Sequence, residues 1–131
     1  MNFFQRRKIL QKVNYLDLVP VRLMDHEVLE NGKVDILLPR FKNIYWKRLF
    51  YNTRREENIR IHLDEIGSQI WLLLDGRLPV RDISEKLQAA IPEKLQPPEE
   101  TDTRVTQFLS LLYQEDYLTF REIMNEKTSG N

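Results

Sequence analysis

The chain has 131 residues, of which 41% are hydrophobic, and no net charge, a composition that indicates one globular domain. It contains no cysteine, which excludes disulfide bonds, thiol nucleophiles and thiolate metal sites. No hydrophobic run approaches the roughly 20 residues of a membrane span, and residues 1–8 lack the order of a secretory signal, so we expect a cytoplasmic protein.

The charge is unevenly distributed along the chain. Residues 1–58 contain 12 Lys and Arg against 7 Asp and Glu, whereas residues 59–131 contain 8 against 13. The favoured interpretation is that the two halves complement each other within one fold. The alternative is a basic surface on the first half that attracts an acidic partner.

The first 20 residues are predicted to form an arm or a short docking helix, because the hydrophobic residues between Phe3 and Val13 follow only a loose helical spacing. A domain is predicted over residues 21–122. Residues 123–131 are polar and are predicted to form a flexible tail.

Three strands are predicted at the start of this domain. Residues 20–24 alternate after a proline and are expected to be extended. Asn31-Gly32 predicts a hairpin with a type I′ turn, in which both central residues have positive φ, and residues 33–38 return as the second strand. Residues 58–63 form the third strand, with outward Arg60 and His62 alternating with the buried Ile59, Ile61 and Leu63.

Residues 40–58 form an insertion in which five aromatic residues lie among arginines and lysines. Aromatic residues between cations are typical of proteins that bind single-stranded nucleic acid. They are equally what a long loop uses to attach itself to a core. No RNA-binding motif surrounds them, so we favour the loop interpretation.

Three helices and a short strand complete the predicted fold. Asp64 is expected to cap the first helix, and Asp75-Gly76 to end it. The second runs from Pro79 to Pro92, and the third begins at a cap formed by Thr101 or Asp102. This order predicts an α+β, winged-helix-like fold, with a three-stranded antiparallel sheet followed by three helices and a short C-terminal strand. The expected core contains Trp71, Leu74, Ile83, Leu87, Phe108 and Leu112.

The segment Leu63-Asp-Glu-Ile-Gly-Ser-Gln-Ile-Trp-Leu-Leu-Leu-Asp-Gly76 resembles the central signature of the PqqD family, named for pyrroloquinoline quinone biosynthesis. The resemblance continues through the second helix and resumes from Asp102 to Leu118. Three features depart from the family pattern, the first being that residues 1–20 are extra. Asp64 stands where the family usually has Asn, and the insertion replaces a tight turn between strands.

This resemblance implies a peptide-recognition element without a cofactor. Such domains hold the leader of a ribosomally made precursor peptide and present it to a modifying enzyme, often of the radical SAM type. The peptide adds a strand to a free sheet edge. The candidate peptide-binding residues are Ile59, Arg60, Ile61, His62 and Leu63 on the third strand, and Arg104 and Leu111 on the third helix. The two arginines suit an acidic leader.

An enzyme is not expected. The two histidines, His26 and His62, have no metal-ligand spacing around them, and no glycine-rich phosphate loop is present. A winged-helix DNA-binding regulator is one alternative, although residues 101–115 contain a single basic residue, Arg104. A protein–protein scaffold that uses the aromatic insertion is another.

Overall fold

The computed structural model describes residues 14–39 and 58–124. Parts of three predicted segments lie outside the described residues. They are residues 1–13 of the arm, 40–57 of the insertion and 125–131 of the tail. The chain divides into two compact units. We call residues 24–68 the sheet unit, and residues 1–23 with 69–131 the helical unit.

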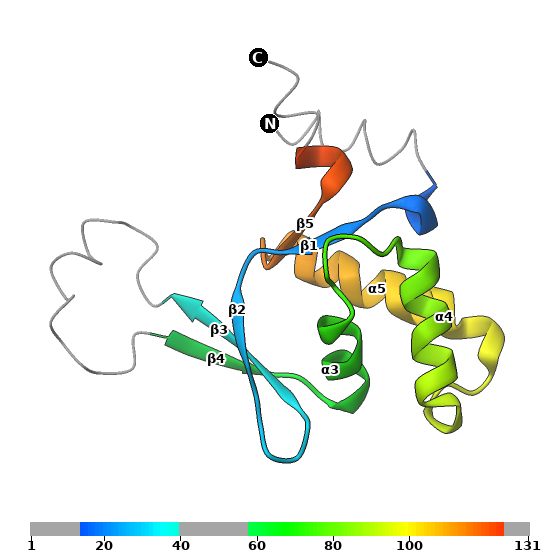
Figure 1. Ribbon diagram of the computed structural model, residues 1–131, viewed down its shortest axis with the longest axis horizontal. Coiled ribbons are helices and arrows are strands. Elements are labelled where there is room, and N and C mark those ends of the chain that lie inside the picture. Colours follow the sequence, from blue (N-terminus) through cyan, green and yellow to red (C-terminus); the bar gives the residue numbers. More distant parts are fainter. Residues whose placement is uncertain (1–13, 40–57, 125–131) are drawn as a thin grey trace, which may run out of the picture. The chain divides into compact units, whose positions relative to one another are not determined.

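The sheet unit contains three antiparallel strands (Figure 1), β2 (Asp25–Val28), β3 (Val34–Pro39) and β4 (Asn58–His62). Their order is β2-β3-β4, so that β3 is central and β2 and β4 are the edges. His26 lies opposite Ile36, which in turn lies opposite Ile61. The predicted three-stranded antiparallel sheet is therefore confirmed.

The hairpin between β2 and β3 is confirmed, but the predicted type I′ turn is wrong. The Leu29 N–H donates to the Lys33 carbonyl at 2.8 Å, so the loop has three residues. Within it Gly32 has a φ of 84°, whereas Asn31 does not have positive φ. The Asn31 side chain instead accepts the Lys33 N–H at 2.9 Å. A three-residue loop that ends in a left-handed glycine is the next most common way to close a hairpin.

The start of helix α3 (Glu65–Leu72) is attached to β3. The Asp64 carboxylate accepts the Gly67 N–H at 2.7 Å, which confirms Asp64 as the helix cap. One residue later, the buried Ser68 hydroxyl accepts the Val34 N–H at 2.8 Å. This bond satisfies a backbone donor at the first residue of the central strand.

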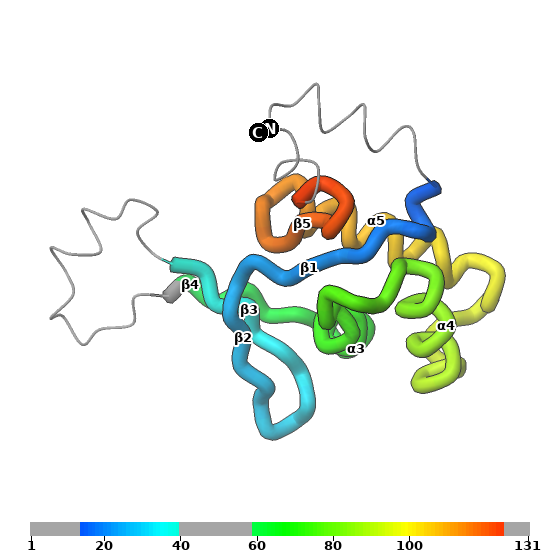
Figure 2. Tube along the Cα trace, turned by 45° about the horizontal axis from the view of Figure 1, so that its top comes forward, coloured from blue at the N-terminus to red at the C-terminus, as the bar shows by residue number. Residues whose placement is uncertain are grey.

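The helical unit contains a second, two-stranded sheet, in which β1 (Pro20–Arg22) pairs antiparallel with β5 (Leu118–Phe120), as Figures 1 and 2 show. The extended segment predicted at 20–24 thus does not join the three-stranded sheet. The predicted C-terminal strand is confirmed. Just before β1, Tyr15 donates to or accepts from the Ser110 hydroxyl at 3.1 Å, so residues near 15 belong to the packed part of this unit.

Two longer helices, α4 (Val80–Ala90) and α5 (Thr101–Gln114), pack against each other in the helical unit. Short 3-10 turns precede and connect them, η1 (Tyr15–Asp17), η2 (Pro92–Lys94) and η3 (Pro98–Glu100). The hydrophobic residues of this unit that are almost fully buried are Leu18, Ile70, Trp71, Leu74, Val80, Ile83, Leu87, Leu95, Val105, Leu109, Leu118 and Phe120.

The predicted core is confirmed except for Phe108, which is only half-buried. The predicted Leu112 is buried together with Val105 and Leu109, and the three residues stand at positions i, i+4 and i+7 of α5. This spacing aligns them on one helical face, and Phe108 lies at the margin of that stripe.

Two helix ends differ from their predictions. α3 ends at Leu72, because the next two N–H groups bond to carbonyls three residues earlier instead of four. Gly76, which follows, has a φ of 79°. Asp75 accepts the N–H groups of Arg77 and Leu78, and these bonds lower the pKa of its carboxyl. The cap of α5 is Glu100 and not Thr101 or Asp102, whose side chains bond to α4.

Candidate functional site

The outer edge of β4 carries unpaired backbone groups within the described part of the chain. The Leu63 N–H donates to the Val34 carbonyl at 3.0 Å, and backbone groups in an antiparallel ladder alternate in direction. The register with β3 therefore turns the backbone of Ile59 and Ile61 towards β3, and that of Arg60 and His62 away from it. β4 is the last strand in its sheet, so this edge is open to an added strand as far as the described residues extend.

The hydrophobic face of β4 is more exposed than predicted. Ile61 and Leu63 are half-buried, but Ile59 is 52% exposed, so the prediction that the strand buries Ile59 is wrong. Ile59 lies opposite Leu38, at the end of the sheet far from the buried Val34. An exposed isoleucine beside an open edge suits contact with the hydrophobic side chain of an added strand.

Charged side chains occupy the other face of the sheet. Glu27, Asp35 and His62 lie in one row across the three strands. His62 Nδ1 lies 2.6 Å from Asp35 Oδ1. Arg60 joins the row by donating to Glu27 at 2.8 Å and to Asp35 at 3.1 Å. As predicted, Arg60 and His62 share the face opposite the isoleucines.

Asp35 is the buried centre of this row, with a side chain that is 4% exposed. Its hydrogen bond with His62, supported by Arg60, lowers the pKa of the Asp35 carboxyl. The two carboxylates of Glu27 and Asp35 raise the pKa of Arg60. Asp35 and Glu27 are not apparent as site residues from the sequence alone, because their contacts with β4 depend on strand register.

The two candidate residues on α5 lie in the helical unit and are not alike. Arg104 is half-buried, and its guanidinium donates to the carbonyls of Lys94 and Gln96 at 3.1 and 3.5 Å. Leu111, two helical turns later on the same side of α5, is 62% exposed. Arg104 therefore supports the preceding loop, whereas Leu111 presents a free hydrophobic side chain. The other five candidate residues, four on β4 and Leu63 directly after it, belong to the sheet unit.

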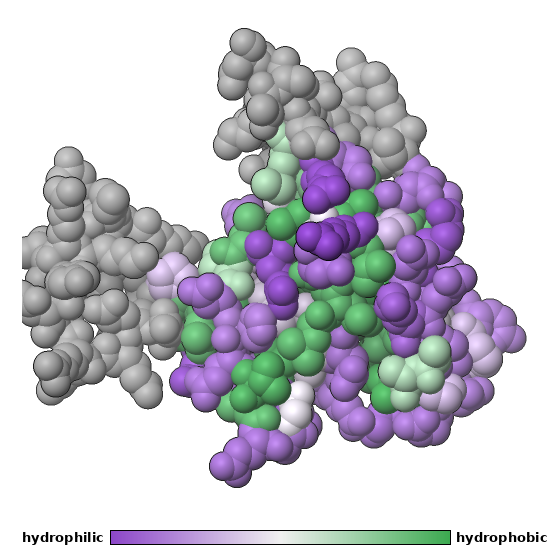
Figure 3. All heavy atoms as spheres, viewed as in Figure 1, coloured by the Kyte–Doolittle hydropathy of each residue, from purple (hydrophilic) through white to green (hydrophobic). Residues whose placement is uncertain are grey.

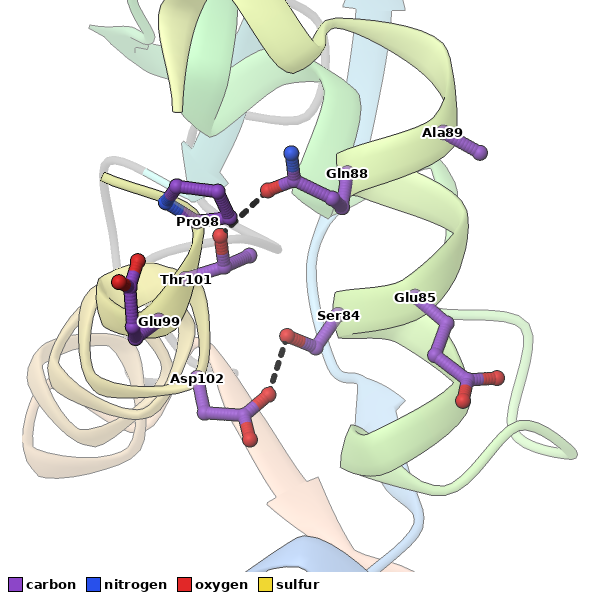
Figure 4. Close-up of a pocket in the computed structure, with 8 residues that line it drawn as sticks. All are labelled: Ser84, Glu85, Gln88, Ala89, Pro98, Glu99, Thr101 and Asp102. Carbon is purple, nitrogen blue, oxygen red and sulfur yellow. Dashed lines mark hydrogen bonds between the residues drawn. The ribbon is translucent and has the colours of Figure 1, made fainter. Parts of the chain in front are cut away.

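A pocket of about 390 Å³ lies between α4 and the start of α5 (Figure 4). Two hydrogen bonds cross it, from Ser84 to Asp102 at 2.5 Å and from Thr101 to Gln88 at 2.6 Å. These four polar side chains thus join the two helices. This explains why Thr101 and Asp102 do not cap α5.

Figure 3 shows hydrophobic residues gathered over the turn end of the β2–β3 hairpin, and Val28, next to that turn in the sequence, is 52% exposed.

Among the described residues, no group of three or more His, Cys, Asp or Glu side chains is placed to hold a metal ion. In the same part of the chain, no helix is both long and hydrophobic enough to cross a membrane.

Comparison with known proteins gives one match. The family model for coenzyme PQQ synthesis protein D (PqqD) matches residues 54–118. The matched range contains β4, the helices α3, α4 and α5, and the first residue of β5. No curated protein and no solved structure matches the chain.

Proposed function

We propose that this chain, which contains a PqqD-like domain over residues 54–118, is a non-catalytic protein that binds a precursor or leader peptide by strand addition along β4. The observation that carries the proposal is that the outer edge of β4 is unpaired among residues 14–39 and 58–124, and β4 lies inside the family match. The proposed peptide-binding residues are Ile59, Arg60, Ile61, His62 and Leu63. Arg104 and Leu111 are a second proposed set on α5.

The physical basis is the alternation of the edge strand. A bound peptide gains main-chain hydrogen bonds from the outward backbone groups of Arg60 and His62. Its side chains then alternate between the face of Ile59 and Ile61 and the charged face. Main-chain bonds supply affinity and the alternating side chains supply selectivity.

The proposed partner is a modifying enzyme of the radical SAM type, to which the domain presents the peptide. The family name refers to synthesis of the coenzyme PQQ, and the peptide and enzyme of this chain are proposed by analogy with it. Both would meet in the cytoplasm, where ribosomal precursors are made. A DNA-binding role is less well supported, because the cation of α5, Arg104, is already bonded to loop carbonyls.

The test is an NMR titration of the whole chain with synthetic leaders of candidate precursors. Shifts are expected to concentrate on residues 58–63. Arg60→Pro removes an outward backbone donor and is compared with Arg60→Ala, which removes only the side chain. The proline variant is expected to bind about two- to ten-fold more weakly than the alanine variant, since one net hydrogen bond is lost.

The opposite edge of the sheet supplies a matched control. The Leu29 N–H bonds to β3, so alternation turns the backbone of Val28 outward from β2. Val28→Pro is expected to leave binding unchanged. Equal binding by Arg60→Pro and Arg60→Ala, or equal losses at both edges, would refute strand addition along β4. Leu111→Ala tests the α5 set without disturbing the bonds of Arg104.

A further inference from the structure

The charged row ends in an exposed group at the open edge. Its hydrogen-bonded side chains alternate as carboxylate, guanidinium, carboxylate and imidazole, in the order Glu27, Arg60, Asp35 and His62, and both Arg60 and His62 lie on β4. Arg60 lies between two carboxylates, so its charge is compensated within the sheet. His62 has a side chain that is 75% exposed, and among the described residues its ring bonds to Asp35 alone. The most exposed side chain of this row on the edge strand β4 is therefore His62.

Asp35 decides which nitrogen of His62 faces outward. An ionised carboxylate only accepts hydrogen bonds, so Nδ1 must carry the proton that it shares with Asp35. The outward nitrogen is then Nε2. In a neutral ring with this tautomer, Nε2 accepts a hydrogen bond, whereas in the imidazolium it donates one.

We propose that His62 selects an acidic side chain at the position opposite it on a strand added to β4, and that Asp35 is the positioning residue that points Nε2 at that side chain. The proposal rests on the proposed function, since it requires a strand at this edge. It names the occupant as an extended peptide whose acidic residues alternate with hydrophobic ones. The hydrophobic residues lie on the face of Ile59 and Ile61, and the acidic ones on the face of Arg60 and His62.

The selection depends on pH with a defined sign. The charged groups on this face are Asp25, Glu27 and Lys33 around the hairpin, with Asp35 and Arg60 beside His62. The comparison of interest is between pH 8 and pH 6. A peptide carboxylate stays ionised throughout that range. An acidic peptide should therefore bind more tightly to the imidazolium, in which Nε2 donates a hydrogen bond, than to the neutral ring, so any change of affinity with pH favours the lower pH.

The experiment uses two synthetic peptides, Ser-Val-Glu-Val-Glu-Val-Ser and the same sequence with Gln in place of Glu, both blocked at their ends. The whole chain is titrated with each at pH 6 and pH 8. We expect the Glu peptide to bind about three-fold more tightly at pH 6, as for an exposed charge interaction, and the Gln peptide to show no change. His62→Gln should remove the pH effect, whereas His26→Gln, on the opposite face of the sheet, should retain it.

A second readout does not require a peptide. Nitrogen-15 chemical shifts of the His62 ring should show a protonated Nδ1 in the neutral form, and this preference should weaken in Asp35→Asn. A neutral ring protonated at Nε2, or a pH effect that survives His62→Gln, would overturn the inference while leaving strand addition intact. If neither peptide shifts residues 58–63 at either pH, strand addition fails and the inference fails with it.

Discussion

The two units of this chain differ in the bonding and exposure of their polar side chains. In the helical unit, Ser84 of α4 donates a hydrogen bond to Asp102 of α5, and Thr101 of α5 donates one to Gln88 of α4. These two bonds link the helices. In the sheet unit, a buried carboxylate, Asp35, is surrounded by charged side chains that extend to solvent. The helical unit therefore has the features of a stable support, and the sheet unit those of a surface that presents an edge strand.

The hydrophobic residues show the same contrast. A continuous set of buried side chains fills the helical unit, whereas the buried hydrophobic residues described in the sheet unit are Val34 and Ile36, both on the central strand. Val28 and Ile59, on the two edge strands, are each 52% exposed. A few changes in each unit test whether this difference has energetic consequences.

The largest expected effect is in the helical unit. Leu112 is 6% exposed and its neighbour Leu111 is 62% exposed, so the two leucines form a matched pair on one helix. Leu112→Ala should lower the free energy of unfolding by about 2–5 kcal/mol, because it removes buried contacts and leaves a cavity. Leu111→Ala should change it by less than about 0.5 kcal/mol. Urea denaturation measures both, and equal losses would contradict the placement of the core stripe.

The next effect is in the sheet unit. Ser68→Ala removes the acceptor of the buried Val34 N–H, and an unsatisfied backbone donor costs about 1–3 kcal/mol. Ser110→Ala, which removes a half-buried bond to Tyr15 in the helical unit, should cost about 1 kcal/mol or less. Denaturation of both variants compares the units directly. A smaller loss for Ser68→Ala than for Ser110→Ala would show that the link between β3 and α3 contributes little.

Acid provides a third comparison. The pKa of Asp35 is lowered below its ordinary value of 3.8, chiefly by His62, so the folded state favours the ionised form. This contribution is present above about pH 4 and is lost as pH falls through the lowered pKa. Asp35→Asn should therefore reduce stability at pH 7 and flatten its decline between pH 4 and pH 2.

The control for this experiment is Asp75→Asn. Two backbone N–H groups in the helical unit lower the pKa of Asp75, so the same sign of pH dependence applies. Unfolding free energies measured at pH 7, 4, 3 and 2 separate the two contributions. An unchanged slope in Asp35→Asn would mean that its ion pairs persist in the unfolded chain or contribute nothing.

Local patterns predicted most of the fold. Alternation placed β3 and β4, the Asp64 cap lay where expected, and helical spacing identified most of the core. The errors occurred where tertiary contacts compete with local preference. β1 pairs with β5, nearly 100 residues away, and the side chain of Asp102 bonds to α4 instead of capping its own helix. The likeness to winged-helix proteins stays a prediction, since no solved structure matches.

The candidate site was predicted only in part. Alternation along β4 separated Arg60 and His62 from the hydrophobic positions. This alternation did not predict the contact of Asp35 with His62, because the partner of a residue on an edge strand depends on the register between strands that are far apart in the sequence. It also overstated the burial of Ile59, since periodicity defines a face but not how far that face is covered.

The smallest expected effect distinguishes the ion pairs of the two units. Arg81 and Asp17 form a pair in the helical unit in which the side chains are 48% and 56% exposed. Water screens such a pair, so Arg81→Ala should cost less than about 1 kcal/mol, and less still at high salt. Arg60→Ala removes one of two partners from a carboxylate that is 4% exposed, and should cost more than Arg81→Ala under the same conditions. Urea denaturation of both variants at low and high salt measures the difference. If the two losses are equal and equally sensitive to salt, Asp35 is hydrated in solution, and the sheet face is an ordinary charged surface without a fixed centre.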